Sequence, residues 1–152
     1  RIIITRTLSK SYSRAGIRMG FSVAHPDLTR GMLKVKDSYN CNTLSLAAGV
    51  AALEDQQWMK DNAARIRQSR STLTASLSEL GFEVETSQAN FVWATHPEGR
   101  HQQIFEEVKN RKILVRYMRF AGADENEIDG LRITVGTDDE LGTFINAMRE
   151  IV

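Results

Sequence analysis

The chain has 152 residues, of which 41% are apolar and 26% charged, and twenty basic residues against nineteen acidic ones give a net charge of +1. This composition is typical of a globular protein with one ordinary domain or two small ones. The basic residues form no stripe and no apolar run approaches eighteen residues, which argues against a nucleic-acid footprint and a membrane-spanning helix.

The first predicted elements flank a lysine. The β-branched run 2–4 predicts a buried strand, and the apolar run 21–24 predicts a second one. The polar stretch between them carries Lys10, which is therefore expected on a loop that joins two strands. A helix is expected over 27–36, because proline and aspartate suit a first turn, and another from near residue 43 or 45 to about 54.

A long helix is expected next, over 57–80, because its apolar positions recur at helical spacing and Gly81 is a natural stop. From Gly81 onward the pattern alternates between strands and helices, which predicts an α/β or α+β layer packed on one sheet. The expected strands are 82–85, 89–94, 113–117 and 131–135, the expected helices are 100–111 and 138–152, and a polar loop is expected over 119–129.

The single cysteine, Cys41, excludes a disulfide within the chain and is typical of the reducing cytoplasm. Cys41 and the three histidines lack the spacing of metal ligands, so no metal site is expected. We interpret Cys41 as a small packing residue, and His25, His96 and His101 as surface or loop residues.

Lys10 has hydroxyl-bearing neighbours and is followed eight residues later by Arg18. A lysine amine that is partly neutral can form a Schiff base with a carbonyl. A guanidinium donates two parallel hydrogen bonds to phosphate, and the hydroxyls of Thr7 and Ser9 can add to them. A phosphorylated aldehyde cofactor needs this combination of residues. The simpler alternative is a solvated loop lysine and a surface arginine.

Residues 7–10 together with 15–20 resemble the lysine segment of fold-type-I pyridoxal-phosphate aminotransferases. Residues 6–21, together with 131–137, are most similar to the histidinol-phosphate aminotransferases within that family. The resemblance covers nearly the whole chain and implies the C-terminal portion of an α/β, aspartate aminotransferase-like fold. Residues 1–64 would be the end of the large cofactor-binding domain and its sheet, and residues 65–152 the small C-terminal α/β domain.

The resemblance also implies chemistry. Lys10 would hold pyridoxal 5′-phosphate as a Schiff base and move a proton, and Arg18 would hold the cofactor phosphate with help from Thr7 and Ser9. The substrates would be an amino donor and a 2-oxo acid: histidinol phosphate and 2-oxoglutarate give imidazole acetol phosphate and glutamate, in histidine biosynthesis. The whole enzyme is expected to be a cytoplasmic homodimer without nucleic-acid or membrane partners. The family's other cofactor ligands lie earlier, so this chain by itself is expected to be inactive.

Two arginines stand within predicted apolar strands, Arg132 in 131–135 and Arg116 after 113–115. A buried arginine is rare unless it is paired, so one on an inner face usually needs an anion. The alternative is an edge-strand arginine that points into water. The resemblance implies that Arg132 binds the acidic group of the substrate, with Arg116 and Asn90 beside it. The stretch 39–42 resembles a family pattern near the cofactor and the dimer interface, or is an ordinary turn and cap.

Three other functions share these features. The lysine segment also resembles that of aminotransferases for aromatic or small amino acids, and that of amino-acid-phosphate decarboxylases. A ligand-sensing, aminotransferase-like domain of a transcription regulator would do so without catalysis. The pair of strand arginines favours a doubly charged phosphate over a carboxylate.

Overall fold

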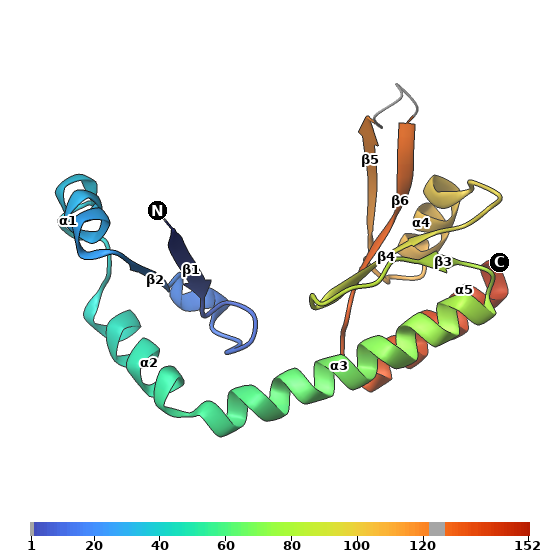
Figure 1. Ribbon diagram of the computed structural model, residues 1–152. Coiled ribbons are helices and arrows are strands. Elements are labelled where there is room, and N and C mark those ends of the chain that lie inside the picture. The colour runs from blue at the N-terminus through green and yellow to red at the C-terminus, as the bar shows by residue number, and fades with distance from the viewer. Residues whose placement is uncertain (1, 122–126) are drawn as a thin grey trace. The chain divides into compact units, whose positions relative to one another are not determined.

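The computed structural model describes residues 2–121 and 127–152 (Figure 1). The chain divides into two compact units, Arg1–Ala63 and Ala64–Val152, so the boundary falls inside the long helix α3 (Gln56–Glu79). None of the described helices is long and apolar enough to cross a membrane. The described residues also contain no group of three His, Cys, Asp or Glu side chains that could hold a metal ion.

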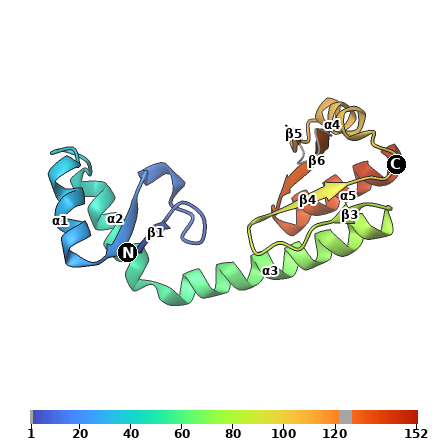
Figure 2. The ribbon, with the colours of Figure 1, turned by 45° about the horizontal axis from the view of Figure 1, so that its top comes forward.

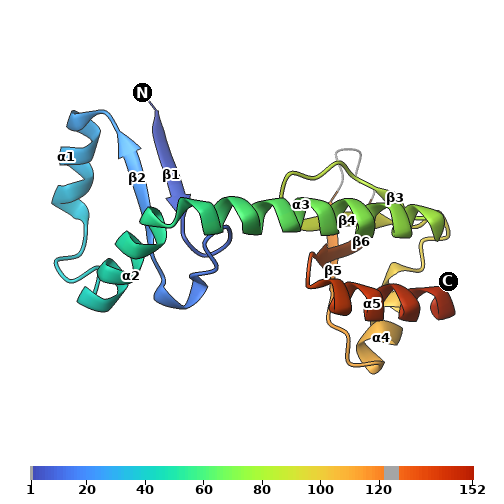
Figure 3. The ribbon, with the colours of Figure 1, turned by 90° about the horizontal axis from the view of Figure 1, so that it is seen from below.

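An antiparallel hairpin begins the first unit. β1 (Ile3–Thr7) pairs with β2 (Gly20–Ala24), and the two strands lie side by side in Figure 3. The N–H of Leu8 donates to the carbonyl of Met19 at 3.1 Å, which extends the ladder by one pair. The predicted arrangement of two strands around the lysine loop is confirmed.

Two helices follow the hairpin, as predicted. They are α1 (Pro26–Val35) and α2 (Thr43–Glu54). The carboxamide oxygen of Asn42 accepts a hydrogen bond from the N–H of Ser45 at 2.8 Å, so Asn42 is the N-cap of α2. Tyr39 is 95% exposed. Within this chain, stretch 39–42 therefore behaves as a turn and a cap.

Most apolar side chains of the first unit are exposed. Ile3 and Ile4 are 45% and 47% exposed, so the prediction of a buried strand is wrong for this chain, because a hairpin offers few neighbours within the described residues. Burial is concentrated where the lysine loop meets α2. Leu8 is 1% exposed there, and a Cβ on Gly49 would lie 2.6 Å from the sulfur of Met19. Gly49 thus permits the loop to pack closely on α2.

The second unit contains a four-stranded antiparallel sheet in the order β3-β4-β6-β5 (Figure 2). Two further helices, with the C-terminal part of α3, contribute to one buried core with one face of the sheet. The strands are β3 (Glu83–Val84), β4 (Phe91–Thr95), β5 (Arg116–Ala121) and β6 (Glu127–Thr134), and the helices are α4 (His101–Asn110) and α5 (Asp138–Ile151).

The core follows the two-residue alternation of the strands. Val92 and Ala94 on β4 are fully buried, as is Leu131 on β6, and they pack with Leu77 of α3 and Met148 of α5. The intervening strand residues point to the opposite face. Strand alternation therefore divides the sheet into a helix-covered face and a face that none of the described helices of this unit covers.

The predicted elements of this unit form, but one strand and one loop were placed wrongly. The run 113–115 lies outside any strand, and β5 begins only at Arg116. Residues 119–121 and 127–129, predicted to be loop, are paired strand; the rest of that predicted loop, 122–126, lies outside the described residues. An apolar run indicates burial, and Ile113 and Val115 do pack against the core. Strand pairing, however, depends on backbone hydrogen bonds in the right register, which polar residues can form as well.

Helix α5 begins with a capping box. The Oγ1 of Thr137 accepts from the N–H of Glu140, whose carboxylate accepts from the N–H of Thr137 at 2.8 Å and from its hydroxyl at 3.0 Å. These hydrogen bonds, led by the one from the backbone N–H, lower the pKa of Glu140. The box satisfies helix N–H groups that would otherwise lack partners.

We expect Thr137→Ala to lower the free energy of unfolding by about 0.5–2 kcal/mol, as loss of an N-cap does. Urea unfolding monitored by Trp93 fluorescence in a Trp58→Phe background measures it. The matched control is Thr143→Ala, in the same helix, where the hydroxyl donates a hydrogen bond to the carbonyl of Asp139 and caps no helix end. Equal effects of the two substitutions would show that the cap contributes nothing.

Candidate functional site

The loop that carries Lys10 is closed by its own backbone. The carbonyl of Lys10 accepts from the N–H of Ser13 at 2.9 Å, and the carbonyl of Leu8 accepts from the N–H of Arg14 at 2.9 Å. The Lys10 side chain is exposed. Because buried Leu8 anchors the loop on α2, the lysine projects from a fixed turn.

Arg18, Thr7 and Ser9 lie at the same end of the hairpin, because the backbone hydrogen bond from Leu8 to Met19 continues the strand ladder there. Arg18 has a φ of 53°, and its Nη1 donates to the carbonyl of Ala15 at 3.0 Å. The Oγ1 of Thr7 accepts from the N–H of Ser9 at 3.1 Å. The structure therefore brings all four predicted cofactor-binding residues onto one short segment.

The donor set of this segment fits a phosphorylated aldehyde. It offers one exposed primary amine, one guanidinium that keeps donors beyond its single bond to Ala15, and two hydroxyls. An amine can bond a carbonyl carbon, and a guanidinium and hydroxyls can surround a phosphate.

The predicted substrate arginines meet on the uncovered face of the four-stranded sheet. Arg116 on β5 lies directly opposite Arg132 on β6, and Trp93 on β4 lies opposite Arg132 on its other side. Arg116 is exposed and Arg132 is half-buried. Like charges placed opposite each other destabilise a sheet, so this pair suits an anion bound between them.

The Arg132 side chain is only partly satisfied. Its guanidinium lies over the ring of Phe91, 4.7 Å from the ring centroid, and its Nε is buried with no hydrogen-bond partner among the described residues. Asn90 lies next to Phe91, and its carbonyl accepts from the N–H of Val135 at 2.9 Å. Sequence reasoning missed Phe91 and Trp93. The alternation of β4 could have found them, because both fall on the face of Arg132.

A second polar cluster, on the helix-covered side, was also missed. His101 is only 4% exposed, so its interpretation as a surface or loop residue is wrong. Its Nε2 accepts from the N–H of His96 at 2.7 Å, which leaves Nδ1–H to donate to Asp129 at 3.0 Å. The hydroxyl of Tyr117 donates to the other oxygen of Asp129 at 2.9 Å. His101 and Asp129 are 28 residues apart in sequence, and no sequence signal links them.

Hydrogen bonding decides the charge of this cluster. Burial acts to raise the pKa of Asp129, but the hydrogen bonds from His101 and Tyr117 outweigh it, so the pKa lies below its usual value. Burial and the bond to Asp129 raise the pKa of Tyr117. A carboxylate held ionised in this way joins α4 to β5 and β6.

A folded-state pKa below the unfolded value of about 3.9 means that Asp129 stabilises the fold above that pH, and that this stability is lost as the pH falls through the folded pKa. We therefore expect Asp129→Ala to cost about 1.5–3 kcal/mol at pH 7 and less below pH ~4. Urea unfolding at pH 7 and pH 3 measures both. Tyr117→Phe, which removes one of the two side-chain bonds, should cost less. A cost for Asp129→Ala that is independent of pH would contradict the role of the charge.

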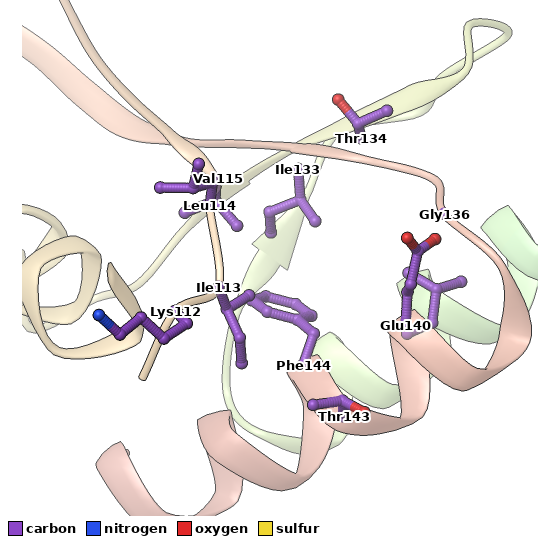
Figure 4. Close-up of a pocket in the computed structure, with 11 residues that line it drawn as sticks. Lys112, Ile113, Leu114, Val115, Ile133, Thr134, Gly136, Glu140, Thr143 and Phe144 are labelled. Carbon is purple, nitrogen blue, oxygen red and sulfur yellow. The ribbon is translucent and has the colours of Figure 1, made fainter. Parts of the chain in front are cut away.

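A cavity of about 430 Å³ lies between segment 112–115, the end of β6 and α5 (Figure 4). Ile113 and Phe144 line it, and none of the predicted site residues does. The carboxylate of Glu140 at its rim is held in the capping box. Apolar side chains make up most of its wall, with Lys112, Thr134 and Thr143 among the lining residues, but no arginine of the described residues lines it, so the arginine-bearing face of the sheet is the better candidate for binding an anion.

Comparison with known proteins gives concordant matches. The family model described as aminotransferase class I and II matches residues 1–148. A histidinol-phosphate aminotransferase of Rhodopirellula baltica is 50% identical over 140 residues, which are 92% of this chain and 38% of that protein. The chain thus spans about two fifths of the length of the curated relatives it matches.

Solved structures match as well. The histidinol-phosphate aminotransferase of Clostridium acetobutylicum has a TM-score of 0.86 at 20% identity, over 98% of this chain and 45% of that one. The enzyme of the same name from Sinorhizobium meliloti, in complex with pyridoxal-5′-phosphate, has a TM-score of 0.80 at 23% identity, over 99% of this chain and 42% of that one. These likenesses confirm the fold expected from the lysine segment.

Proposed function

Because this chain belongs to the aminotransferase class I and II family, we propose that the whole protein transfers an amino group with pyridoxal 5′-phosphate as cofactor. The observation that carries the proposal is the loop between β1 and β2, where Lys10, Arg18 and two hydroxyls gather at one end of the hairpin. When bound, this cofactor supplies an electron sink for negative charge that develops at the Cα of the substrate.

The residues of the loop have distinct roles in this proposal. The Lys10 amine would bond the aldehyde carbon of the cofactor and, once the substrate has displaced it, would carry the proton that leaves Cα. Arg18, with Thr7 and Ser9, would bind the phosphate through charge-assisted hydrogen bonds. Leu8, buried against α2, fixes the turn and so positions the amine.

We propose histidinol phosphate as the amino donor and 2-oxoglutarate as the acceptor, giving imidazole acetol phosphate and glutamate. The names of the most similar relatives support this choice. Its support in the chain is the opposed pair Arg116 and Arg132, which suits a doubly charged phosphate. Asn90, beside Phe91 on the neighbouring strand, would complete the substrate contacts.

The exposed apolar side chains of the first unit are evidence that this unit packs against other parts of a larger protein. Ile2 is 77% exposed and Val23 59%, and apolar patches of this kind usually mark an interface. We propose that further strands of the large-domain sheet cover the hairpin in the whole protein, and that this protein is a cytoplasmic homodimer. The 152-residue chain by itself would then lack part of the site.

The decisive assay gives the whole protein histidinol phosphate, pyridoxal 5′-phosphate and 2-oxoglutarate. We expect glutamate to form in proportion to the donor consumed. When amino-acid phosphates replace the donor, we expect no release of carbon dioxide. The control is the 152-residue chain, which we expect to show no turnover. Carbon dioxide release without a need for a 2-oxo acid would make the protein a decarboxylase, and binding without turnover would favour a ligand sensor.

A further inference from the structure

The sheet face that α4 and α5 leave uncovered carries a mixed set of side chains. The register places the same-face residues of β4, β6 and β5 in rows, and we call them the arginine face. Its members include Phe91, Trp93, Arg132, Arg116, Met118 and Phe120, together with Thr134, Gly130 and Ile128. Two aromatic rings have different neighbours here: Phe91 lies against Arg132, whereas Phe120 lies against Trp93 with ring centroids 5.7 Å apart.

Phe91 and Arg132 are diagonal neighbours across β4 and β6, since Trp93 is the residue directly opposite Arg132. With 4.7 Å between the guanidinium carbon and the ring centroid, the ring covers one side of the guanidinium. A cation over an aromatic face is attracted by the electron density of the ring. This attraction opposes the repulsion from Arg116, the like charge on the next strand.

The Nε–H of Arg132 still needs an acceptor. It is buried, and no acceptor reaches it from the described residues. A buried donor without a partner is costly, and a guanidinium grips an oxyanion through two parallel N–H groups. An anion that binds side-on, through Nε and one Nη, would satisfy the orphan donor.

We propose that Phe91 is a positioning residue for the anionic group of the substrate. Its ring holds the Arg132 guanidinium against the sheet, so that the Nε edge is presented to a phosphate or carboxylate. The inference rests on the proposed function and deepens it, because it assigns the orientation of the proposed substrate-binding arginine to the ring of Phe91.

The first test is nuclear magnetic resonance of the 152-residue chain, observing the arginine Nε–Hε signals. The signal that disappears in Arg132→Lys is that of Arg132. A proton held against an aromatic face is shifted upfield, so we expect this signal to move downfield in Phe91→Leu and to keep its position in Phe91→Tyr. The matched control is Phe120→Leu, which removes a ring of the same face that lies against Trp93 and pairs with Ile128, whereas the ring under the Arg132 guanidinium is that of Phe91. An Arg132 signal that is unchanged in Phe91→Leu would overturn the proposal.

The second test is a titration with inorganic phosphate, compared with chloride at equal ionic strength. We expect phosphate to shift the Arg132 Hε signal, and the dissociation constant to rise roughly 2- to 30-fold in Phe91→Leu, as for loss of a cation–π contact. The Phe91→Tyr and Phe120→Leu chains should bind phosphate with the affinity of the unsubstituted chain. A general loss of packing would instead weaken binding in Phe120→Leu as well as in Phe91→Leu. Equal affinity in Phe91→Leu, or no response of Arg132 to phosphate, would overturn the inference. The transaminase proposal is tested separately, by turnover of the whole protein.

Discussion

Lys10→Ala in the whole protein is expected to abolish the pH-dependent visible absorbance of lysine-bound pyridoxal 5′-phosphate and to reduce turnover by several orders of magnitude. Lys10 is the exposed amine of the closed loop between β1 and β2. Its loss removes both the covalent attachment of the cofactor and the group that moves the proton at Cα. Absorbance spectra across pH and single-turnover kinetics with histidinol phosphate measure the two effects.

The matched control is Lys34→Ala, a lysine in the last turn of α1. It should change neither the spectrum nor turnover. Arg18→Ala should instead weaken cofactor binding by about 1.5–3 kcal/mol, the contribution of hydrogen bonds to a charged group, while leaving the lysine-bound spectrum at saturating cofactor. An unchanged spectrum in Lys10→Ala would refute the assignment of the lysine.

Arg132→Lys is expected to raise KM for histidinol phosphate and to lower kcat/KM by about 10- to 150-fold, which corresponds to roughly 1.5–3 kcal/mol. Lysine keeps the charge but loses the two parallel donors, and here it would also lose the Nε–H that lies buried without an acceptor among the described residues. Steady-state kinetics with histidinol phosphate and with phenylalanine as donors measure the effect.

Arg116 allows the phosphate to be tested separately. Arg116→Ala should cost more with the phosphorylated donor than with phenylalanine, because it removes the second charge opposite Arg132. Arg119→Lys, on the same strand and ion-paired with Glu127, is the control and should affect neither donor. Equal losses for both donors in Arg116→Ala would point to a general aromatic aminotransferase.

The lysine segment could be understood from sequence because its signals are local. The strand, the polar turn with Lys10 and the second strand follow one another within 24 residues, and the hairpin ladder then brings Arg18 beside Thr7 and Ser9. The helices could be predicted for the same reason, since their periodicity and caps lie within a few residues of each other.

The cross-strand and buried contacts were decided only by the tertiary structure. Phe91 meets Arg132, and His101 meets Asp129, through pairing and packing between segments 28 or more residues apart. The start of β5 at Arg116 was decided in the same way, because backbone pairing with β6 overrode the apolar run before it. The sequence by itself thus determined the position of the lysine loop and the order of elements, which depend on neighbours along the chain. Only the fold determined which side chains surround the arginines, because strand register and helix packing join residues that no local pattern connects.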